Sequence, residues 1–295
     1  MESVFGAILT AMVTPFDADL RVDEAASAAL MHHLVGHGSD GLVIAGTTGE
    51  ASTLTDDEKL ALFRLARREL ADTATVVANT GSNDTAHSVH LTRQAADIGC
   101  DAVLAVTPYY NKPPREGIVA HFAAIAEVGL PVIVYNIPGR SVINLEPTLL
   151  AELADIPNIV AVKQAHDDID ELRTICAAGR LAVYAGNDDL LLAVTEYGGA
   201  GVISVASHIV GPEMGEIYSS GTSGHFEHAL ALDADLQDLY AALFVTSNPI
   251  LIKAALEMLK LIPSDRMRLP LVQASPVQKH ILQSVLEQHG ILARD

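Results

Sequence analysis

Eight short apolar runs recur along the first part of the chain, and turn-forming residues bound each of them. Valine, isoleucine, leucine and alanine dominate these runs, with little alternation between apolar and polar positions. Nearly continuous hydrophobicity is typical of strands that are covered on both faces, as in a parallel sheet. The predicted strands are 6–13, 41–46, 75–79, 102–107, 131–136, 158–163, 181–186 and 201–205.

The segments between these runs have helical periodicity and polar outer faces. The clearest is 56–70, where Thr55 is placed to cap the helix and Glu58 completes a capping-box pattern. Alternating strands and helices over about 1–222 predict the α/β class and a (β/α)8 (TIM) barrel. An open doubly wound sheet is disfavoured, because it would have fewer strands and a phosphate-binding loop after the first one.

After Gly224 the pattern is helical throughout, with predicted helices at 225–245, 249–261 and 275–289. We therefore expect a catalytic barrel over 1–223 and a C-terminal three-helix appendage over 224–295. No low-complexity linker separates the two parts, so we expect them to pack as one unit.

Charge and cysteine content narrow the possible partners. The net charge is −19, with 37 acidic against 18 Lys and Arg residues, which argues against binding to nucleic acid or to an anionic membrane surface. Cys100 and Cys176 are too few for a disulfide framework and lack zinc-site spacing, so a reduced, cytoplasmic protein is expected. The least charged C-terminal stretch, 239–252, is too short to span a membrane, and the apolar run 4–13 lacks the basic flank of a signal peptide.

Reactive groups of a (β/α)8 barrel sit at the C-terminal ends of its strands, so these ends direct the search. Lys163 closes the sixth apolar run, with hydrocarbon behind its amine. An ordinary lysine is neutral in only roughly one molecule in two thousand at pH 7. Burial would lower its pKa and supply a free amine for attack on a carbonyl. The alternative is a structural lysine paired with a barrel carboxylate.

Other strand ends offer weaker candidates. Tyr135 ends the fifth strand and could relay protons, although such a tyrosine is more often a packing residue. Thr47 and Thr48 lie in a glycine-flanked turn that could hold a carboxylate or could simply lead into a helix. Arg140 follows a Pro-Gly turn and could bind a carboxylate with two hydrogen bonds, or be an ordinary surface residue.

Four strand-end motifs occur together in register: GTTGE at 46–50, TPYYNKP at 107–113, YNIPGR at 135–140 and Lys163. In this combination the chain resembles the dihydrodipicolinate synthase family of pyruvate-dependent class I aldolases and lyases. The resemblance extends into the tail, through NPI at 248–250 and RLPL at 268–271. It implies a lyase that condenses pyruvate with L-aspartate 4-semialdehyde to give 4-hydroxy-tetrahydrodipicolinate, a step of lysine and diaminopimelate biosynthesis.

The resemblance also implies roles for single residues. Lys163 would form the Schiff base with pyruvate, and Tyr135 would relay protons through Thr47 to Tyr110 of a neighbouring subunit. Four further positions would bind or line the substrates: Thr48 for the pyruvate carboxylate, Arg140 for the aldehyde's carboxylate, and Gly186 and Ile203 by their backbone. No metal or cofactor is implied, and the family usually forms homotetramers built from tight dimers.

The chain departs from the family pattern at three places. Gln164, followed by Ala165-His166, stands where an acidic residue is common, which bears on the aldehyde substrate. At the lysine-feedback site, Lys59 replaces a histidine and His87 replaces a glutamate. We therefore expect weak or absent inhibition by lysine.

Several further signals favour ordinary structure. The histidine pairs at helical spacing lack the additional ligands that a metal site needs. The GGAG segment at 198–201 precedes the eighth strand and predicts a turn at the bottom of the barrel. The acidic cluster 167–171 suits a helix start. At the barrel mouth, Lys112, Arg140 and Lys163 against Glu50 predict a positive local field despite the overall charge.

Three other functions compete with the leading hypothesis. A related pyruvate-dependent enzyme could keep Lys163 and take a sugar-acid or other aldehyde. A phosphate-binding barrel isomerase would need glycine-rich N–H donors after strand eight, and 206–208 offers few. In a non-catalytic barrel, Lys163 would be dispensable.

Overall fold

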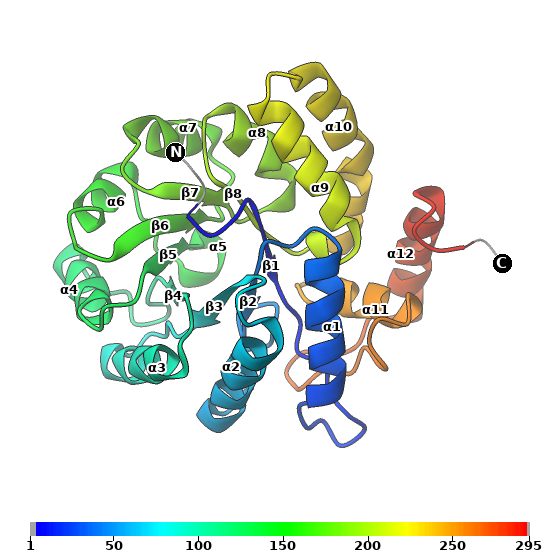
Figure 1. Ribbon diagram of the computed structural model, residues 1–295, viewed down its shortest axis with the longest axis horizontal. Helices are drawn as coiled ribbons and strands as arrows, with labels where there is room; N and C mark the ends of the chain where they lie inside the picture. Colours follow the sequence, from blue (N-terminus) through cyan, green and yellow to red (C-terminus); the bar gives the residue numbers. More distant parts are fainter. Residues whose placement is uncertain (1–3, 294–295) are drawn as a thin grey trace.

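The eight apolar runs form a closed, all-parallel barrel in a computed structural model that describes residues 4–293. The strands are β1 (Ile8–Ala11), β2 (Gly41–Ile44), β3 (Thr75–Asn79), β4 (Ala102–Val106), β5 (Val132–Asn136), β6 (Ile159–Gln164), β7 (Ala182–Ala185) and β8 (Gly201–Ser204). Strand β1 pairs with both β2 and β8, which closes the sheet. The predicted (β/α)8 barrel is confirmed, and Figure 1 shows its strands inside a ring of helices.

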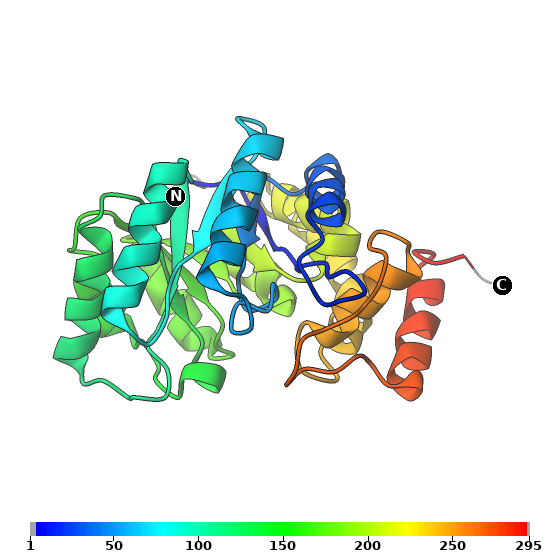
Figure 2. The same cartoon turned by 90° about the horizontal axis from the view of Figure 1, so that it is seen from below.

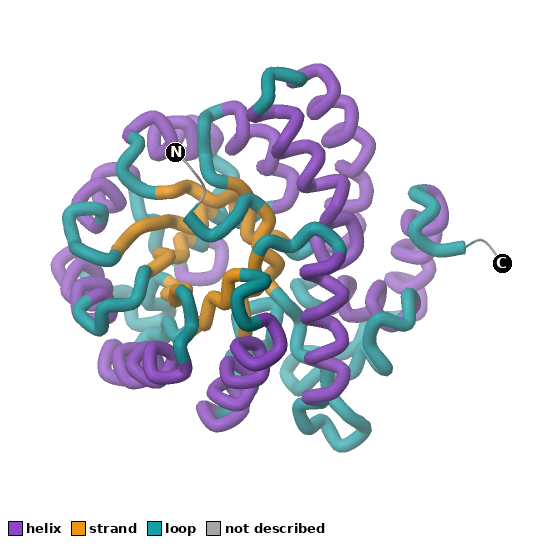
Figure 3. Tube along the Cα trace, in the orientation of Figure 1, coloured by secondary structure: helices purple, strands orange, loops and turns teal. Residues whose placement is uncertain are grey.

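Helices follow each strand and continue through the tail, as Figure 3 shows in purple. They are α1 (Glu24–Gly36), α2 (Asp56–Leu70), α3 (Thr85–Ile98), α4 (Arg115–Ala126), α5 (Pro138–Ser141), α6 (Pro147–Leu153), α7 (Ile169–Ala178), the 3-10 turn η1 (Asp188–Leu190), α8 (Leu191–Glu196), α9 (Ser207–Thr222), α10 (Phe226–Leu243), α11 (Ile250–Met258) and α12 (Pro276–Gln288). Helix α2 has the predicted bounds and the predicted capping box at Thr55 and Glu58.

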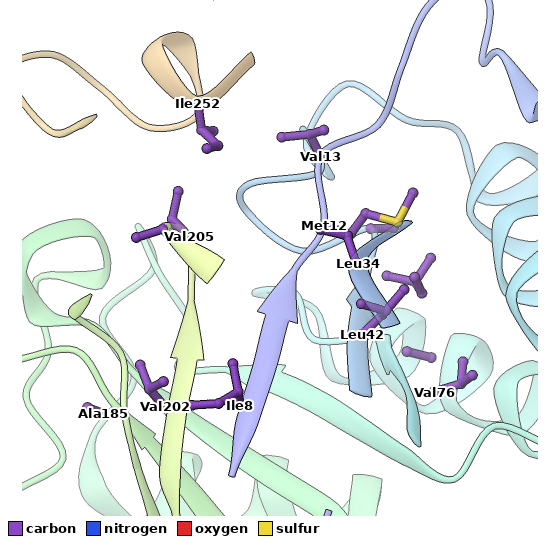
Figure 4. Close-up of a cluster of buried hydrophobic side chains, with 14 of the residues drawn as sticks. Ile8, Met12, Val13, Leu34, Leu42, Val76, Ala185, Val202, Val205 and Ile252 are labelled. Atoms are coloured by element: carbon purple, nitrogen blue, oxygen red, sulfur yellow. The ribbon is translucent and has the colours of Figure 1, made fainter. Parts of the chain in front are cut away.

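Two apolar cores account for the stability of this arrangement. One fills the barrel with inward-facing side chains, among them Leu9, Ile133 and Ile203. The other lies between the strands and the surrounding helices, and Figure 4 shows part of it. In that view Ile252 of α11 lies with Val205 and Val13, so the C-terminal region shares the core of the barrel.

Helices α11 and α12 lie beside the barrel, outside the ring formed by the other helices (Figures 1 and 2). Helix α10 follows α9 in the chain and packs against it. The division at 223/224 stays a prediction, with α9 ending at Thr222 and α10 beginning at Phe226. Within 4–293, no helix combines the length and the hydropathy that a membrane crossing requires.

The predicted turn at 198–201 and the predicted helix start at 167–171 are confirmed. The turn leads from α8 into β8, which begins at Gly201 with a φ of +139°. A Cβ at Gly201 would lie 1.9 Å from the carbonyl oxygen of Ala7, so only glycine fits there. Asp168 caps α7 by accepting hydrogen bonds from the backbone N–H groups of Asp170 and Glu171.

Candidate active site

Lys163 and Tyr135 meet at the C-terminal ends of two adjacent strands. They are direct register partners on β6 and β5, and the Lys163 amine lies 4.6 Å from the centroid of the Tyr135 ring. Each residue is only 5% exposed. Residues at alternate positions of a strand face the same side, so Lys163 shares the inward face of the barrel with Ala161 of β6. The strand pairing thus holds a lysine amine against a phenol ring at the barrel mouth.

Burial changes the chemistry of the Lys163 amine. It lowers the pKa of Lys163 to about 8, while the negative charge of Asp188 raises this pKa and the positive charge of Arg140 lowers it further. Within residues 4–293, the Lys163 amine forms no ion pair or hydrogen bond. The structure therefore favours a reactive lysine over one held in a structural pair with a carboxylate.

Tyr135 is held in its protonated form. Burial raises the pKa of Tyr135 to about 12, while the charge of Arg140 and the side chain of Thr47 lower it. A neutral phenol beside an amine can donate a proton and regain it from a neighbour, as a relay requires. The Thr47 side chain thus acts on the phenol, and its part in a relay stays a prediction from the family resemblance.

Asp188 is a residue that sequence reasoning missed. Its buried carboxylate accepts hydrogen bonds from the backbone N–H groups of Val205 (3.1 Å) and Ala206 (2.9 Å). The carboxylate thereby fixes the connection after β8 and supplies the acidic charge that acts on Lys163. The only signal in the sequence was its place after Gly186-Asn187 at the end of strand seven.

The GTTGE turn follows β2 and carries both threonines. Thr48 is buried and Thr47 is half-buried. Helix α2 begins only at Asp56, so the turn itself supplies any carboxylate contact and the helix N-terminus does not. Gly49 allows the turn to approach the segment after β1, because a Cβ there would lie 3.0 Å from the carbonyl oxygen of Met12.

A cavity of about 620 Å³ lies over this turn, and Thr47, Asn79, Tyr109, Arg140 and Asn248 are among the residues that line it. Arg140 belongs to the short helix α5 and is exposed. Its guanidinium has one contact within residues 4–293, a long one of 3.5 Å to the carbonyl oxygen of Asn248. Most of its five N–H donors therefore remain available to a ligand. Lys163 does not line this cavity.

Gly186 and Ile203 lie at strands β7 and β8. The Gly186 N–H donates to the carbonyl oxygen of Gln164 at 2.7 Å, and a Cβ on Gly186 would lie 2.5 Å from that of Ala165. Ile203 is fully buried in the barrel. By contrast, Tyr110 is 89% exposed with a φ of +73°, and it does not line the cavity of its own chain.

The departure at Gln164 lies away from the inward face of the barrel. Gln164 is buried and its side-chain oxygen accepts a hydrogen bond from Asn136 at 3.0 Å. Asn136 also bonds to Asn144 and to the backbone of Leu145, in the connection before α6. His166 bonds to Glu171 on α7. Gln164 and His166 therefore serve the contacts between strands and helices.

Glu50, the main acidic residue that the sequence places at the mouth, is paired within the protein. It is 2% exposed and accepts a hydrogen bond from the Lys253 amine at 2.7 Å. Its other oxygen accepts the backbone N–H of Arg268 at 3.0 Å. Glu50 lines the cavity together with two other acids, Asp56 and Asp84.

The histidine pairs are the residues that the sequence analysis weighed, and set aside, as metal ligands. His33 and His37 stack on each other, with ring centroids 4.0 Å apart. No cluster of three or more His, Cys, Asp and Glu side chains suited to a metal ion occurs among the described residues.

Comparisons with known proteins agree with this geometry. The sequence profile of the Dihydrodipicolinate synthetase family matches residues 4–289. The 4-hydroxy-tetrahydrodipicolinate synthase of Moorella thermoacetica is 46% identical over 291 residues, covering 98% of this chain and 99% of that protein. A synthase of the same name from Prochlorococcus marinus is 47% identical over 287 residues, covering 96% and 94%.

Solved structures of enzymes of this family have the same fold as this chain. The enzyme from Cyanidioschyzon merolae, solved with lysine bound, superposes with a TM-score of 0.95 at 40% identity, covering 98% of this chain and 99% of that one. The chloride-inhibited enzyme of Acinetobacter baumannii, solved with pyruvate, has a TM-score of 0.95 at 36% identity, covering 98% and 100%. By profile, sequence and structure together, this chain belongs to the dihydrodipicolinate synthetase family.

Proposed function

We propose that this protein is a 4-hydroxy-tetrahydrodipicolinate synthase, a lyase that condenses pyruvate with L-aspartate 4-semialdehyde on Lys163. The observation that carries the proposal is a buried Lys163 amine beside Tyr135 at the barrel mouth, with no ion-pair partner among residues 4–293. Full-length identity of about 45% to synthases of this name supports the substrate assignment.

The proposed reaction starts with attack of the neutral Lys163 amine on the ketone carbon of pyruvate. Loss of water gives an iminium, and loss of a methyl proton gives an enamine. The enamine carbon attacks the aldehyde carbon, forming the new C–C bond. The amino group of the former aldehyde then attacks the iminium carbon, which closes the ring and releases Lys163.

The other site residues would bind the substrates and transfer protons during these reaction steps. Tyr135 would carry protons between the Lys163 adduct and Thr47, and onward to Tyr110 of a neighbouring subunit. Thr48 would bind the pyruvate carboxylate and Arg140 that of the aldehyde substrate. The backbones of Gly186 and Ile203 would line the pocket.

We also propose a cytoplasmic homotetramer built from tight dimers. The exposed Tyr110 supports this, because a large aromatic residue outside its own cavity suits insertion into a neighbouring site.

Borohydride reduction tests the proposed chemistry directly. With pyruvate present, reduction should add one pyruvate-derived group, and peptide mass analysis should place it on Lys163. Lys163→Met should abolish both the adduct and turnover, with unfolding temperature as the control for folding. An adduct on another residue, or none, would contradict the enzyme assignment. Assays with aspartate semialdehyde and with sugar-derived aldehydes then separate the two candidate substrates.

The neighbouring lysine-feedback site is proposed to respond weakly to lysine. His87 hydrogen-bonds to Asp56 at 2.9 Å, and Lys59 lies 3.8 Å from the same carboxylate. Lys59 and His87 both line the cavity. His87 stands where the family pattern has a glutamate to hold the inhibitor's amine. We expect L-lysine at about 1 mM to remove less than half of the activity. His87→Glu should increase the sensitivity, and strong inhibition of the unaltered protein would refute the proposal.

A further inference from the structure

Asn248 contacts both residues that are proposed to bind substrate carboxylates. It lies in the connection between α10 and α11, within the C-terminal region, and lines the same cavity as Arg140. Its side-chain amide donates to the Thr48 hydroxyl at 2.9 Å, and its carbonyl oxygen lies 3.5 Å from the Arg140 guanidinium. One residue outside the barrel thus contacts two strand-end residues from separate loops.

The hydrogen bond to Thr48 determines what the Thr48 hydroxyl can do. A hydroxyl has one proton to donate and two lone pairs that accept. The amide N–H of Asn248 occupies one lone pair, and within residues 4–293 no protein acceptor takes the Thr48 side-chain proton. Because Thr48 is only 2% exposed, the bond also limits rotation of the side chain. The hydroxyl is left as an oriented donor for an anionic ligand.

A buried ion pair holds the two sides of this contact together. Lys253 lies on α11, five residues after Asn248, and Glu50 lies two residues after Thr48 in the GTTGE turn. The Lys253 amine donates to Glu50 at 2.7 Å, to the carbonyl oxygen of Arg266 at 2.6 Å and to that of Thr14 at 3.0 Å. All three N–H donors of the ammonium are therefore satisfied by the protein. The turn and the helix start are fixed relative to each other.

We propose that Asn248 is a positioning residue that presents Thr48 to the pyruvate carboxylate and braces Arg140 for the carboxylate of the aldehyde. The side chain of Asn248 serves the pyruvate site, whereas its backbone serves the aldehyde site. This inference rests on the proposed function. It assigns to the C-terminal region a direct part in substrate binding.

Because the side chain of Asn248 contacts Thr48 and its backbone contacts Arg140, substitutions in the full-length protein can separate the two roles. Asn248→Ala removes the amide and keeps the carbonyl, so we expect the KM for pyruvate to rise about three- to tenfold, as for one lost hydrogen bond. The KM for the aldehyde and kcat should change less than twofold. Asn248→Asp replaces the donor with a negative charge and should raise the KM for pyruvate more than tenfold. Ser247→Ala, in the same connection, is the matched control.

A double-mutant cycle excludes a merely structural role. In a Thr48→Val background, which lacks the hydroxyl, Asn248→Ala should no longer change the KM for pyruvate. An unchanged KM in the single variants, or an equal effect with and without the hydroxyl, would overturn the inference. Failure of the unaltered protein to form a pyruvate adduct on Lys163 would instead refute the proposed function.

Discussion

A buried amine without a partner dominates the site at the scale of single residues. Most buried charges in proteins are paired, because removing an ion from water is costly. Lys253 follows this rule with Glu50, whereas Lys163 does not. Lys253 is therefore paired with a carboxylate, whereas Lys163 has no such partner among residues 4–293.

The pKa of Lys163 predicts how adduct formation depends on pH. With a value of about 8, the neutral amine makes up about one tenth of the protein at pH 7 and more than half above pH 8. The rate of pyruvate adduct formation should therefore rise roughly tenfold per pH unit below pH 7 and level off above about pH 8. Rapid-quench borohydride trapping from pH 6 to 9 measures this rate.

Arg140→Met provides the matched variant for that experiment. Since the positive charge of Arg140 lowers the pKa of Lys163, its removal should move the profile toward higher pH. A profile that stays in place in the variant would show that Arg140 exerts no field on the amine.

At the scale of elements, the barrel mouth combines the strand ends that carry Lys163 and Tyr135 with short connections that are held in place by helices. The GTTGE turn approaches the segment after β1 through Gly49 and contacts the C-terminal region through Glu50. Helix α2 then begins at a full capping box, in which Thr55 accepts the N–H of Glu58. The end of this loop is thus fixed by a pattern that is local in sequence.

Thr55→Ala tests the contribution of the cap. Loss of the hydroxyl leaves one helix N–H without its acceptor, and the free energy of unfolding should fall by about 1 kcal/mol. Thr55→Ser keeps the oxygen and should cost much less. Urea unfolding followed by circular dichroism checks both variants. Equal stability of the alanine and serine variants would show that the cap is dispensable.

Local patterns explain which parts of the protein were predictable. The strand positions, the α2 cap and the burial of Lys163 at a strand end depend on neighbours in sequence, and the structure agrees with all three. Asn248 and Asp188 were missed as site residues, because their partners come from other parts of the chain. Thr48 and Asn248 are 200 positions apart. No periodicity encodes such a contact, and the pairing of Glu50 with Lys253 was not predicted for the same reason.

The whole molecule combines an acidic surface with a site for anionic substrates. The charge of −19 is spread over the chain, whereas Arg140 faces the cavity with most of its donors free. Cavities respond to the nearest charges, since more distant exposed ones are screened by salt. The composition therefore argues against nucleic acid as a partner but could not predict the sign of the field at the site.

Assembly provides a prediction at this scale, through Tyr110. If each site takes Tyr110 from a neighbour, Tyr110→Phe and Lys163→Met chains should each be nearly inactive alone. Mixed by co-expression, they should regain about a quarter of full activity, because half of the dimers are mixed and each has one intact site. Activity equal to the sum of the separate variants would contradict a shared site.

The buried pair of Glu50 and Lys253 has a consequence for how the protein is made. Glu50 lies near the start of the chain, whereas its partners Lys253 and Arg268 are translated after the last barrel strand. An unfinished chain would hold an uncompensated carboxylate beneath its substrate-binding turn, which is costly to bury. We expect a chain that ends before residue 253 to lack an ordered GTTGE turn, because both partners of the Glu50 carboxylate would be missing.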